Sequence, residues 1–256
     1  MLPNIPNLFR QKINAKEQLI GLWLSTTNPL IAEMAGMTGY EWLVLDGEHS
    51  PADIPLQLQQ LQALNGSTSA PVGRPPINEP AIIKQYLDIG FYNLLIPFIE
   101  SRQEAEQAVA ATRYPPVGIR GVAGMVRASG YGATPEFYAH VNDNITVLLQ
   151  IESRKGVEAV DDIAAVEGVD GIFIGPSDLS AALGHLGNPN HPEVQQTIRH
   201  IHERTIAAGK ATGILAIQPQ DAHRYLEMGF HFVAVGLDLS ILKQGMLGLR
   251  QQFHTK

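Results

Sequence analysis

The residues best suited to chemistry follow a short apolar run near the start of the chain. Residues 42–46 are apolar up to Asp46, and Glu48 and His49 come directly afterwards. An imidazole exchanges its proton near neutral pH, and a neighbouring carboxylate such as Asp46 would orient the ring. This cluster predicts that His49 transfers a proton in general acid–base catalysis. The alternative is that His49 only anchors a loop.

Two later apolar runs, 146–151 and 171–175, end in the same way. The polar residues at their ends are Gln150, Glu152, Ser177 and Asp178, and Gly175 ends the second run. Two carboxylates in a chain without cysteine suit a hard divalent ion such as Mg²⁺ or Mn²⁺. We therefore predict that Glu152 and Asp178 bind a metal ion. The alternative is that a carboxylate caps the next helix, as Asp178 would for the turn that follows it.

A single arginine occupies a matching position at the end of another apolar run. Arg74 ends residues 70–74 and would supply a fixed cation for a carboxylate or a developing oxyanion. The alternative is a structural ion pair with Asp46 or Glu48. Gly73 and Pro75 flank the arginine and weaken the strand propensity there.

These polar residues need a scaffold that brings the ends of several strands together. Strands are predicted at 20–25, 42–46, 70–74, 92–98, 146–151, 171–175, 211–215 and 232–236. Helices are predicted at about 29–37, 52–64, 79–89, 101–112, 155–166, 191–208, 219–228 and 238–254. Alternating strands and helices favour parallel βαβ units. The pattern predicts a (β/α)₈ TIM barrel, which carries its active site at the carboxyl ends of the strands.

Length and composition agree with this fold. The chain has 256 residues, close to the roughly 250 typical of such a barrel, and no linker divides it, so residues 1–256 are expected to form one domain. The net charge of −7 gives no reason to expect nucleic-acid binding. No apolar stretch is long enough for a membrane span, and the first residues do not resemble a signal peptide. We expect a cytoplasmic enzyme.

Two long segments are expected to cover the mouth of the barrel. Residues 113–143 carry three arginines, Arg113, Arg120 and Arg127, which are candidates for holding a distal carboxylate or for a surface role. Residues 184–192 carry His185, a weaker candidate. Long loops at this end of a barrel are usually functional. The remaining histidines are expected to be solvated or packed.

A lysine that forms a Schiff base with a carbonyl substrate would be the rival chemistry for such a barrel. That mechanism needs a desolvated lysine near the strand ends. Lys155 is the closest to the predicted mouth, but it lies in a polar segment, and the other lysines fall on helices or at the opposite end. The sequence therefore favours a metal over an imine.

With these motifs in hand, the chain resembles the metal-dependent class II pyruvate aldolases, which include 4-hydroxy-2-oxoheptanedioate aldolase. The resemblance covers nearly the whole chain. It rests on Leu-Asp-Gly-Glu-His at 45–49, Gln-Ile-Glu at 150–152, Gly-Pro-Ser-Asp at 175–178 and Gly-Ile-Arg-Gly-Val at 118–122. Gly-Phe-Tyr-Asn at 90–93, Arg-Tyr-Pro-Pro at 113–116 and Gly-His-Leu-Gly-Asn at 184–188 look most like the 2-dehydro-3-deoxyglucarate aldolase branch.

The resemblance implies a role for each site residue. Glu152 and Asp178 match metal ligands for Mg²⁺, with Mn²⁺ or Co²⁺ as alternatives. His49 matches the base, Arg74 the residue that stabilises the enolate, and Gln150, Gly175, Ser177 and Asp178 the substrate contacts. Asp88 matches an aspartate that tunes the histidine. Because Asp88 ends a predicted helix and precedes a strand, we expect it at the opposite end of its own barrel, within reach only of a neighbouring subunit's histidine.

The resemblance also implies substrates and partners. The expected reaction is reversible cleavage of a 4-hydroxy-2-oxo acid into pyruvate and an aldehyde such as tartronate semialdehyde. The expected assembly is a homohexamer with an exchanged C-terminal helix, and the apolar residues of 238–254 fit such an exchange. The alternatives are cleavage of a related 2-oxo acid (4-hydroxy-2-oxoheptanedioate or 2-keto-3-deoxyrhamnonate), an isomerase or epimerase that also forms an enolate, and a non-catalytic barrel that binds an oxo acid.

Overall fold

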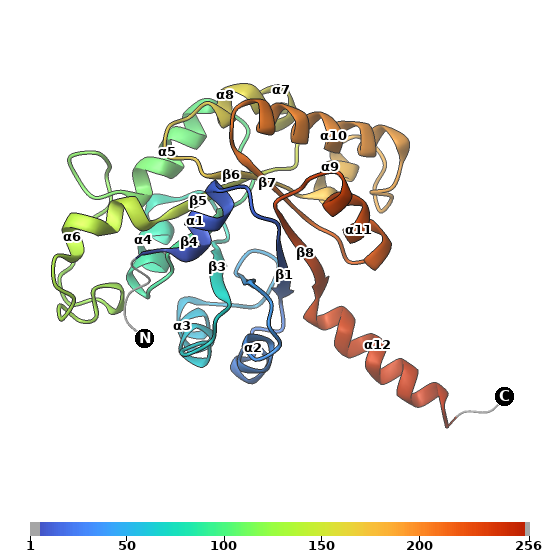
Figure 1. The fold of residues 1–256 in the computed structure, drawn as a ribbon, viewed down its shortest axis with the longest axis horizontal. Coiled ribbons are helices and arrows are strands. Elements are labelled where there is room, and N and C mark those ends of the chain that lie inside the picture. Colours follow the sequence, from blue (N-terminus) through green and yellow to red (C-terminus); the bar gives the residue numbers. More distant parts are fainter. Residues whose placement is uncertain (1–5, 254–256) are drawn as a thin grey trace.

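A computed structural model describes residues 6–253 and contains a closed barrel of parallel strands in the order β1 to β8 (Figure 1). The strands are β1 (Leu19–Leu24), β2 (Trp42–Asp46), β3 (Ala70–Arg74), β4 (Asn93–Ile96), β5 (Thr146–Ile151), β6 (Gly171–Ile174), β7 (Ala211–Leu215) and β8 (Phe232–Leu237). Each predicted strand is present, so the predicted barrel is confirmed. The fourth strand is shorter than predicted because Pro97 has no amide hydrogen and Phe98 adopts a left-handed conformation with φ of 55°.

The helices surround this barrel. They are α1 (Leu8–Asn14), α2 (Pro29–Gly36), α3 (Ile54–Ala63), α4 (Pro80–Asp88), α5 (Arg102–Thr112), α6 (Phe137–His140), α7 (Arg154–Glu158), α8 (Val160–Ala164), α9 (Pro176–Ala182), α10 (Pro192–Ala207), α11 (Pro219–Glu227) and α12 (Asp238–Gln251). Two 3₁₀ turns, Arg127–Ser129 and Val141–Asn144, lie in the long segment before β5. The helix predicted at 155–166 is divided in two at Ala159, and no helix of the described chain is long and apolar enough to cross a membrane.

Helix α1 was not predicted, although the sequence carries its signals. The Asn7 side chain caps the helix by accepting a hydrogen bond from the Arg10 amide. Phe9 and Ile13 are buried and lie one turn apart, on the face that packs against the barrel interior. The ring of Phe9 lies 6.1 Å from that of Trp42. The helix therefore covers the end of the barrel at which the strands begin.

Large aromatic residues inside the barrel are matched by glycines on the neighbouring strands. Trp42 lies beside Gly21, and Phe232 lies beside Gly213 in the register of adjacent strands. A β-carbon added at Gly213 would lie 2.1 Å from the Phe232 ring. The Phe232 ring is fully buried, so it has no free space into which it could move. This pairing of a large ring with a glycine lets the side chains of adjacent strands pack closely in the interior.

We expect Gly213→Ala to lower the free energy of unfolding by about 1–3 kcal/mol, because it overpacks the barrel interior. Gly124→Ala is the matched control, since its β-carbon would have only the Tyr138 hydroxyl within 4 Å, at 3.9 Å. The control should change the free energy by no more than about 0.5 kcal/mol. Urea unfolding at one protein concentration measures both. Equal stability of the two variants would contradict the packing argument.

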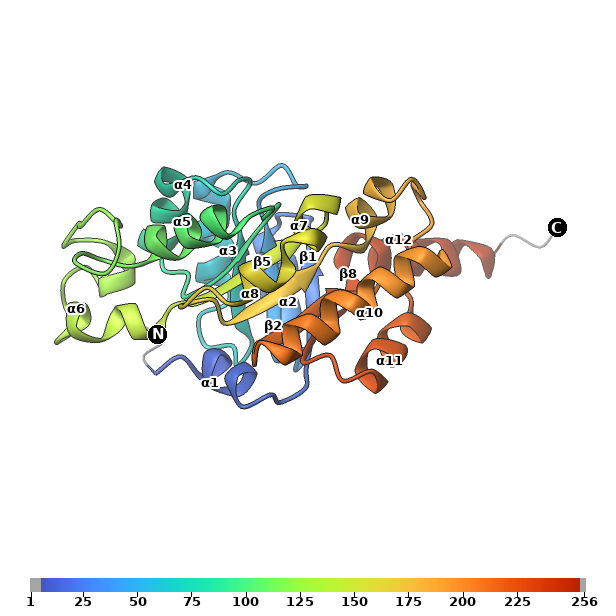
Figure 2. The ribbon, with the colours of Figure 1, turned by 90° about the horizontal axis from the view of Figure 1, so that it is seen from above.

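The segment 113–143 does not cover the mouth of the barrel, so that prediction is wrong. It follows helix α5, and helices of this fold run back towards the starting ends of the strands. Arg113 donates to the Ile145 carbonyl directly before β5, and Arg127 donates to the Ile89 carbonyl before β4. Figure 2 shows α6, which belongs to this segment, at the opposite extreme of the molecule from α12.

Candidate active site

The polar residues predicted for the site do gather at the carboxyl ends of the strands. Asp46 ends β2, Arg74 ends the adjacent strand β3, and the two are register partners. Gln150 lies in β5 and Glu152 follows that strand directly. The adjacent strand β6 leads into Gly175, Ser177 and Asp178, the last two in the first turn of α9.

Arg74 is held rigidly by Asp46. Its Nε donates to Asp46 Oδ1 at 2.9 Å and its Nη2 donates to Oδ2 at 2.8 Å. Trp23 donates from Nε1 to the same carboxylate, and its ring lies 4.6 Å below the guanidinium carbon. Burial alone would raise the pKa of Asp46, but the hydrogen bonds and charge of Arg74 outweigh it and lower that pKa. Asp46 is therefore an ionised anchor that aims the arginine.

The glycine before Arg74 is required by packing. A β-carbon at Gly73 would lie 2.9 Å from the rings of Tyr86 and Phe91, which stack on each other. β3 runs uninterrupted through Gly73 to Arg74, so the weak strand propensity of this position is overridden by its neighbours.

The Glu48 carboxylate lies between the side chains of Arg74 and His49. Its Oε2 lies 2.5 Å from Arg74 Nη1 and 4.0 Å from His49 Nε2. Burial raises the pKa of Glu48, and the charges of Arg74 and His49 partly offset this effect. The His49 side chain is 65% exposed, and only its backbone amide approaches Asp46. The predicted orientation of the ring by Asp46 is therefore absent here, and Glu48 is the acid closest to the ring.

Glu152 is buried at the mouth, directly after β5. Its Oε2 accepts a hydrogen bond from Gln150 Nε2 at 2.6 Å, and its Oε1 accepts one from the Phe98 amide at 3.1 Å. Gly175 must be glycine, because a β-carbon there would lie 2.3 Å from Glu152 Oε2. Burial, together with the charges of Glu48 and Asp178, raises the pKa of Glu152 to about 7.

Asp178 faces solvent at the start of α9 and does not cap it, because that helix has no side-chain cap. Its charge acts on both Glu48 and Glu152. Three carboxylates thus act on one another at the mouth, with Arg74 as the cation that partly compensates them. A divalent cation would relieve the remaining repulsion, so the oxygen donors present fit a hard metal ion.

Two features of the site were not predicted from sequence. Glu48 was considered only as an ion-pair partner of Arg74, although its position between Asp46 and His49 was a usable signal. Phe98 carries no sequence signal, because its contribution is a backbone amide aimed at Glu152 from a strained left-handed conformation. Strain of this kind persists only when the surrounding structure enforces it, and it concentrates at functional sites.

Asp88 and the three arginines of segment 113–143 lie away from the mouth. Asp88 ends α4, and its Oδ1 accepts a hydrogen bond from Arg120 Nη2 at 2.7 Å. The guanidinium of Arg120 also lies 4.4 Å from the Tyr114 ring. These contacts leave Arg113, Arg120 and Arg127 unable to hold a substrate at the mouth of their own barrel, and they place Asp88 out of reach of His49 in the same chain.

The lysines offer no Schiff-base site within residues 6–253. The Lys155 side chain is 77% exposed, and its Nζ lies 3.7 Å from Glu100. Lys210 donates to the Val169 carbonyl before β6, at the other end of the barrel. No described lysine is buried. A desolvated amine, which imine chemistry requires, is therefore missing from the described part of the chain.

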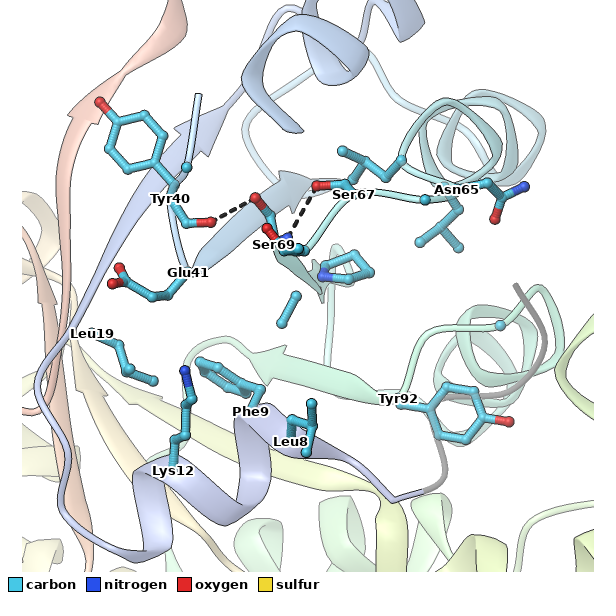
Figure 3. A pocket seen from close by; sticks show the side chains of 18 of the residues that line it. Leu8, Phe9, Lys12, Leu19, Tyr40, Glu41, Asn65, Ser67, Ser69 and Tyr92 are labelled. Carbon is cyan, nitrogen blue, oxygen red and sulfur yellow. Dashed lines mark hydrogen bonds between the residues drawn. The ribbon is translucent and has the colours of Figure 1, made fainter. Parts of the chain in front are cut away.

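A cavity of about 460 Å³ lies at the opposite end of the barrel from the carboxylates (Figure 3). Its walls come from α1 and from the residues at which β1, β2, β3 and β4 begin, including Phe9, Glu41, Ser69 and Tyr92. In its wall, Ser69 donates to the Tyr40 carbonyl at 2.6 Å. Of the residues predicted for the site only Arg127, a candidate for holding a distal carboxylate, lines the cavity, so the cavity is not the candidate active site.

Comparisons with known proteins agree with this geometry. The family model for HpcH/HpaI aldolase/citrate lyase matches residues 19–244. The chain is 58% identical to a 5-keto-4-deoxy-D-glucarate aldolase of Escherichia coli O157:H7 over 97% of each chain. A crystal structure of an HpcH/HpaI aldolase/citrate lyase family protein from Burkholderia cenocepacia J2315 superposes with a TM-score of 0.95 at 39% identity, covering 97% of this chain and 100% of that one.

A second solved structure, the HpcH/HpaI aldolase from Desulfitobacterium hafniense DCB-2, superposes with a TM-score of 0.88 at 26% identity and covers 96% of this chain and 97% of that one. The predicted resemblance to the aldolases is confirmed, as is the prediction of a carbon–carbon lyase. The chain belongs to the HpcH/HpaI aldolase/citrate lyase family.

Proposed function

We propose that the protein reversibly cleaves a sugar acid of the 5-keto-4-deoxy-D-glucarate type. Counted from its other end, this compound is a 4-hydroxy-2-oxo acid, so aldol cleavage yields pyruvate and tartronate semialdehyde. The observation that carries the proposal is the meeting of Arg74, His49, Glu152 and Asp178 at one mouth. A relative of 58% identity with this named activity supports the choice of substrate.

Glu152 and Asp178 would hold the divalent metal, with Mg²⁺ the first candidate and Mn²⁺ or Co²⁺ as alternatives. The metal, when bound, would supply Lewis-acid polarisation of the 2-oxo acid. The hydrogen bonds from Gln150 and the Phe98 amide fix the Glu152 carboxylate in one orientation. Such support of a ligand by its neighbours keeps it positioned for the ion.

The remaining residues have two roles, which are proton transfer and binding of the substrate and its enolate. His49 removes the proton of the 4-hydroxyl, the bond between carbons 3 and 4 breaks, and its electron pair forms the pyruvate enolate while the aldehyde leaves. A proton returned to the enolate carbon completes pyruvate. Arg74, aimed by Asp46, stabilises the negative charge that develops on the enolate oxygen. Gln150, Gly175 and Ser177 would contact the bound oxo acid.

The direct test is pyruvate release from a panel of 4-hydroxy-2-oxo acids, coupled to lactate dehydrogenase. We expect the highest kcat/KM with the six-carbon diacid, and lower values with 4-hydroxy-2-oxoheptanedioate and 2-keto-3-deoxyrhamnonate. Conversion of the same acids without pyruvate release would favour the isomerase or epimerase alternative. Absence of any turnover with added metal would favour a barrel that only binds an oxo acid.

We further propose that α12 packs on another subunit, in a homohexamer. The helix projects away from the barrel (Figure 1). Leu239, Ile241, Met246 and Leu249 are each about half exposed or more, while the start of the helix is fixed by Asp238, which accepts hydrogen bonds from the Ser25 and Thr26 amides. A helix that exposes so many apolar side chains gains stability by burying them on a partner.

Light scattering after size exclusion tests this assembly. We expect a mass that is a multiple of the 27.9 kDa chain at micromolar concentration, and a smaller mass for Ile241→Asp combined with Met246→Asp. Lys243→Asp, on the same helix, is the control for added negative charge. A wild-type mass of one chain would contradict the proposal.

A further inference from the structure

Two imidazoles and a carboxylate meet outside the candidate active site, on the loop between α9 and α10 and in the first turn of α10. They are His185, His191 and Glu193, and each offers a ligand atom within 4.8 Å of those of the other two. His185 Nε2 lies 2.7 Å from Glu193 Oε2, and the two histidine rings stack with their centroids 3.4 Å apart. Among residues 6–253 this is the one group of three histidine or acidic residues so close together.

The backbone holds the three residues in this arrangement. The His185 amide donates to the Ser180 carbonyl at the end of α9, and the His191 amide donates to the Asn188 carbonyl within the loop. Pro192 begins α10, so Glu193 lies in its rigid first turn. The backbone is therefore held near each of the three residues, and the two stacked rings, whose planes are 15° apart, turn about their side-chain bonds to face one ion.

We propose that His185, His191 and Glu193 bind a zinc-like divalent ion, with water completing a tetrahedral set. Two histidines and a glutamate form a recurrent zinc ligand set, with metal–ligand distances of roughly 2.0–2.2 Å. Tetrahedral ligands at that distance lie roughly 3.4 Å apart, so the His185–Glu193 pair must open by less than about 1 Å. The His191 ring now accepts a hydrogen bond from the Glu193 amide at 3.2 Å, which binding through Nδ1 would replace.

This site would differ from the aldolase site in the metal that it prefers. Glu152 and Asp178 offer only oxygen, which suits Mg²⁺, whereas imidazole nitrogens favour Zn²⁺, Ni²⁺ or Co²⁺ over Mg²⁺. Excess Mg²⁺ can therefore fill one site while the other remains available for Zn²⁺. Figure 2 shows α9 towards the outside of the molecule, and the side chains of His185 and Glu193 are 23% and 50% exposed, so solvent reaches the cluster.

The test is a zinc titration of metal-stripped protein in excess Mg²⁺, with a fluorescent zinc chelator as competitor. We expect one zinc per chain in the wild type and also in the Glu152→Gln, Asp178→Asn double variant, which lacks the aldolase ligands. His185→Ala and His191→Ala should each weaken zinc binding at least tenfold. Binding should also weaken at pH 5.5, because protons compete with the metal for imidazole.

His140→Ala is the matched control, since His140 also faces a glutamate, Glu136 at 3.7 Å, but is not part of such a group of three. It should leave zinc binding unchanged. The proposal is overturned if the wild type binds no zinc in excess Mg²⁺, or if His185→Ala binds it as tightly as the wild type. In either case the cluster is only an ion pair and helix cap. Zinc binding by the double variant separates this outcome from any failure of the proposed aldolase mechanism.

Discussion

Chelation of divalent ions is expected to abolish pyruvate release, and Mg²⁺ or Mn²⁺ is expected to restore it. In Glu152→Gln the metal should bind more than about 10²-fold more weakly, because loss of a ligand charge should exceed the 10–100-fold typical of losing a supporting contact. The variant should still fold. The Phe98 amide keeps an acceptor, and Gln150, whose Oε1 has no hydrogen-bond partner, can turn its amide to accept from the new side chain.

Glu100→Gln provides the control for this substitution. Glu100 is another carboxylate near the mouth, but it bonds Ser153 Oγ at 2.7 Å rather than the site residues. The metal affinity of the Glu100→Gln variant, measured by calorimetry, should equal that of the wild type. Full activity in excess chelator, or trapping of an imine with borohydride, would instead establish a lysine mechanism.

The metal affinity should also depend on pH in a defined direction. The pKa of Glu152 lies near 7 in the metal-free protein, above its usual 4.5, because the ionised form is disfavoured in the folded state. The folded state therefore binds this proton more tightly than the unfolded state. The free energy of unfolding falls as pH rises from 4.5 to 7, and it stays at the lower value above pH 7. The metal needs the ionised form, so its apparent affinity should fall roughly tenfold per pH unit below 7. Titrations at pH 6 and 8 measure the difference.

The positions of the strands follow from the sequence because most of them are mainly buried apolar runs bounded by turns. Trp42–Asp46 and Ala70–Arg74 have the predicted bounds, since the residues that end them change abruptly from apolar to polar. The fourth strand was predicted too long because it was extended through Pro97, a usable local signal, and through Phe98, which leaves the extended conformation where its amide bonds the distant residue Glu152. Tertiary contacts of this kind have no local signal.

The placement of segment 113–143 was wrong for a reason of topology. It was treated as an excursion after a strand, although helix α5 at Arg102–Thr112 intervenes and reverses the direction of the chain. The sequence marks the start of that helix with Ser101 followed by Glu104, the pattern of a capping box, and Ser101 Oγ accepts from the Glu104 amide. The reciprocal bond of a capping box is displaced by one residue, because Glu104 Oε2 accepts from the Glu100 amide.

The residue types at the site could be predicted from the sequence, but which side chain contacts which partner could not. Asp46 lies close to His49 in sequence, which favoured it as the partner of the ring. In the fold, the side chains of a strand alternate in direction, and Asp46 instead points to Arg74 on the adjacent strand. The exposed His49 ring is therefore free to be positioned by Glu48, the bound substrate or a neighbouring subunit.

His49→Ala is expected to lower kcat about 10²–10⁴-fold, the usual contribution of general acid–base catalysis, while metal affinity stays unchanged. The side chain is largely exposed and its ring has no hydrogen bond to Asp46, so the substitution should leave the fold and the Arg74–Asp46 pair intact. His223→Ala, on helix α11 at the outside of the barrel, is the control and should retain wild-type kcat.

Exchange of pyruvate methyl protons with deuterated water separates proton transfer from carbon–carbon cleavage. Enolate formation from pyruvate needs a base but no aldehyde, so His49→Ala should slow this exchange, followed by NMR, as it slows cleavage. If both rates stay near those of the wild type, His49 only anchors its loop. Glu48, which lies 4.0 Å from the imidazole and bonds Arg74, would then be the next base to test, because burial raises its pKa towards the range that proton transfer requires.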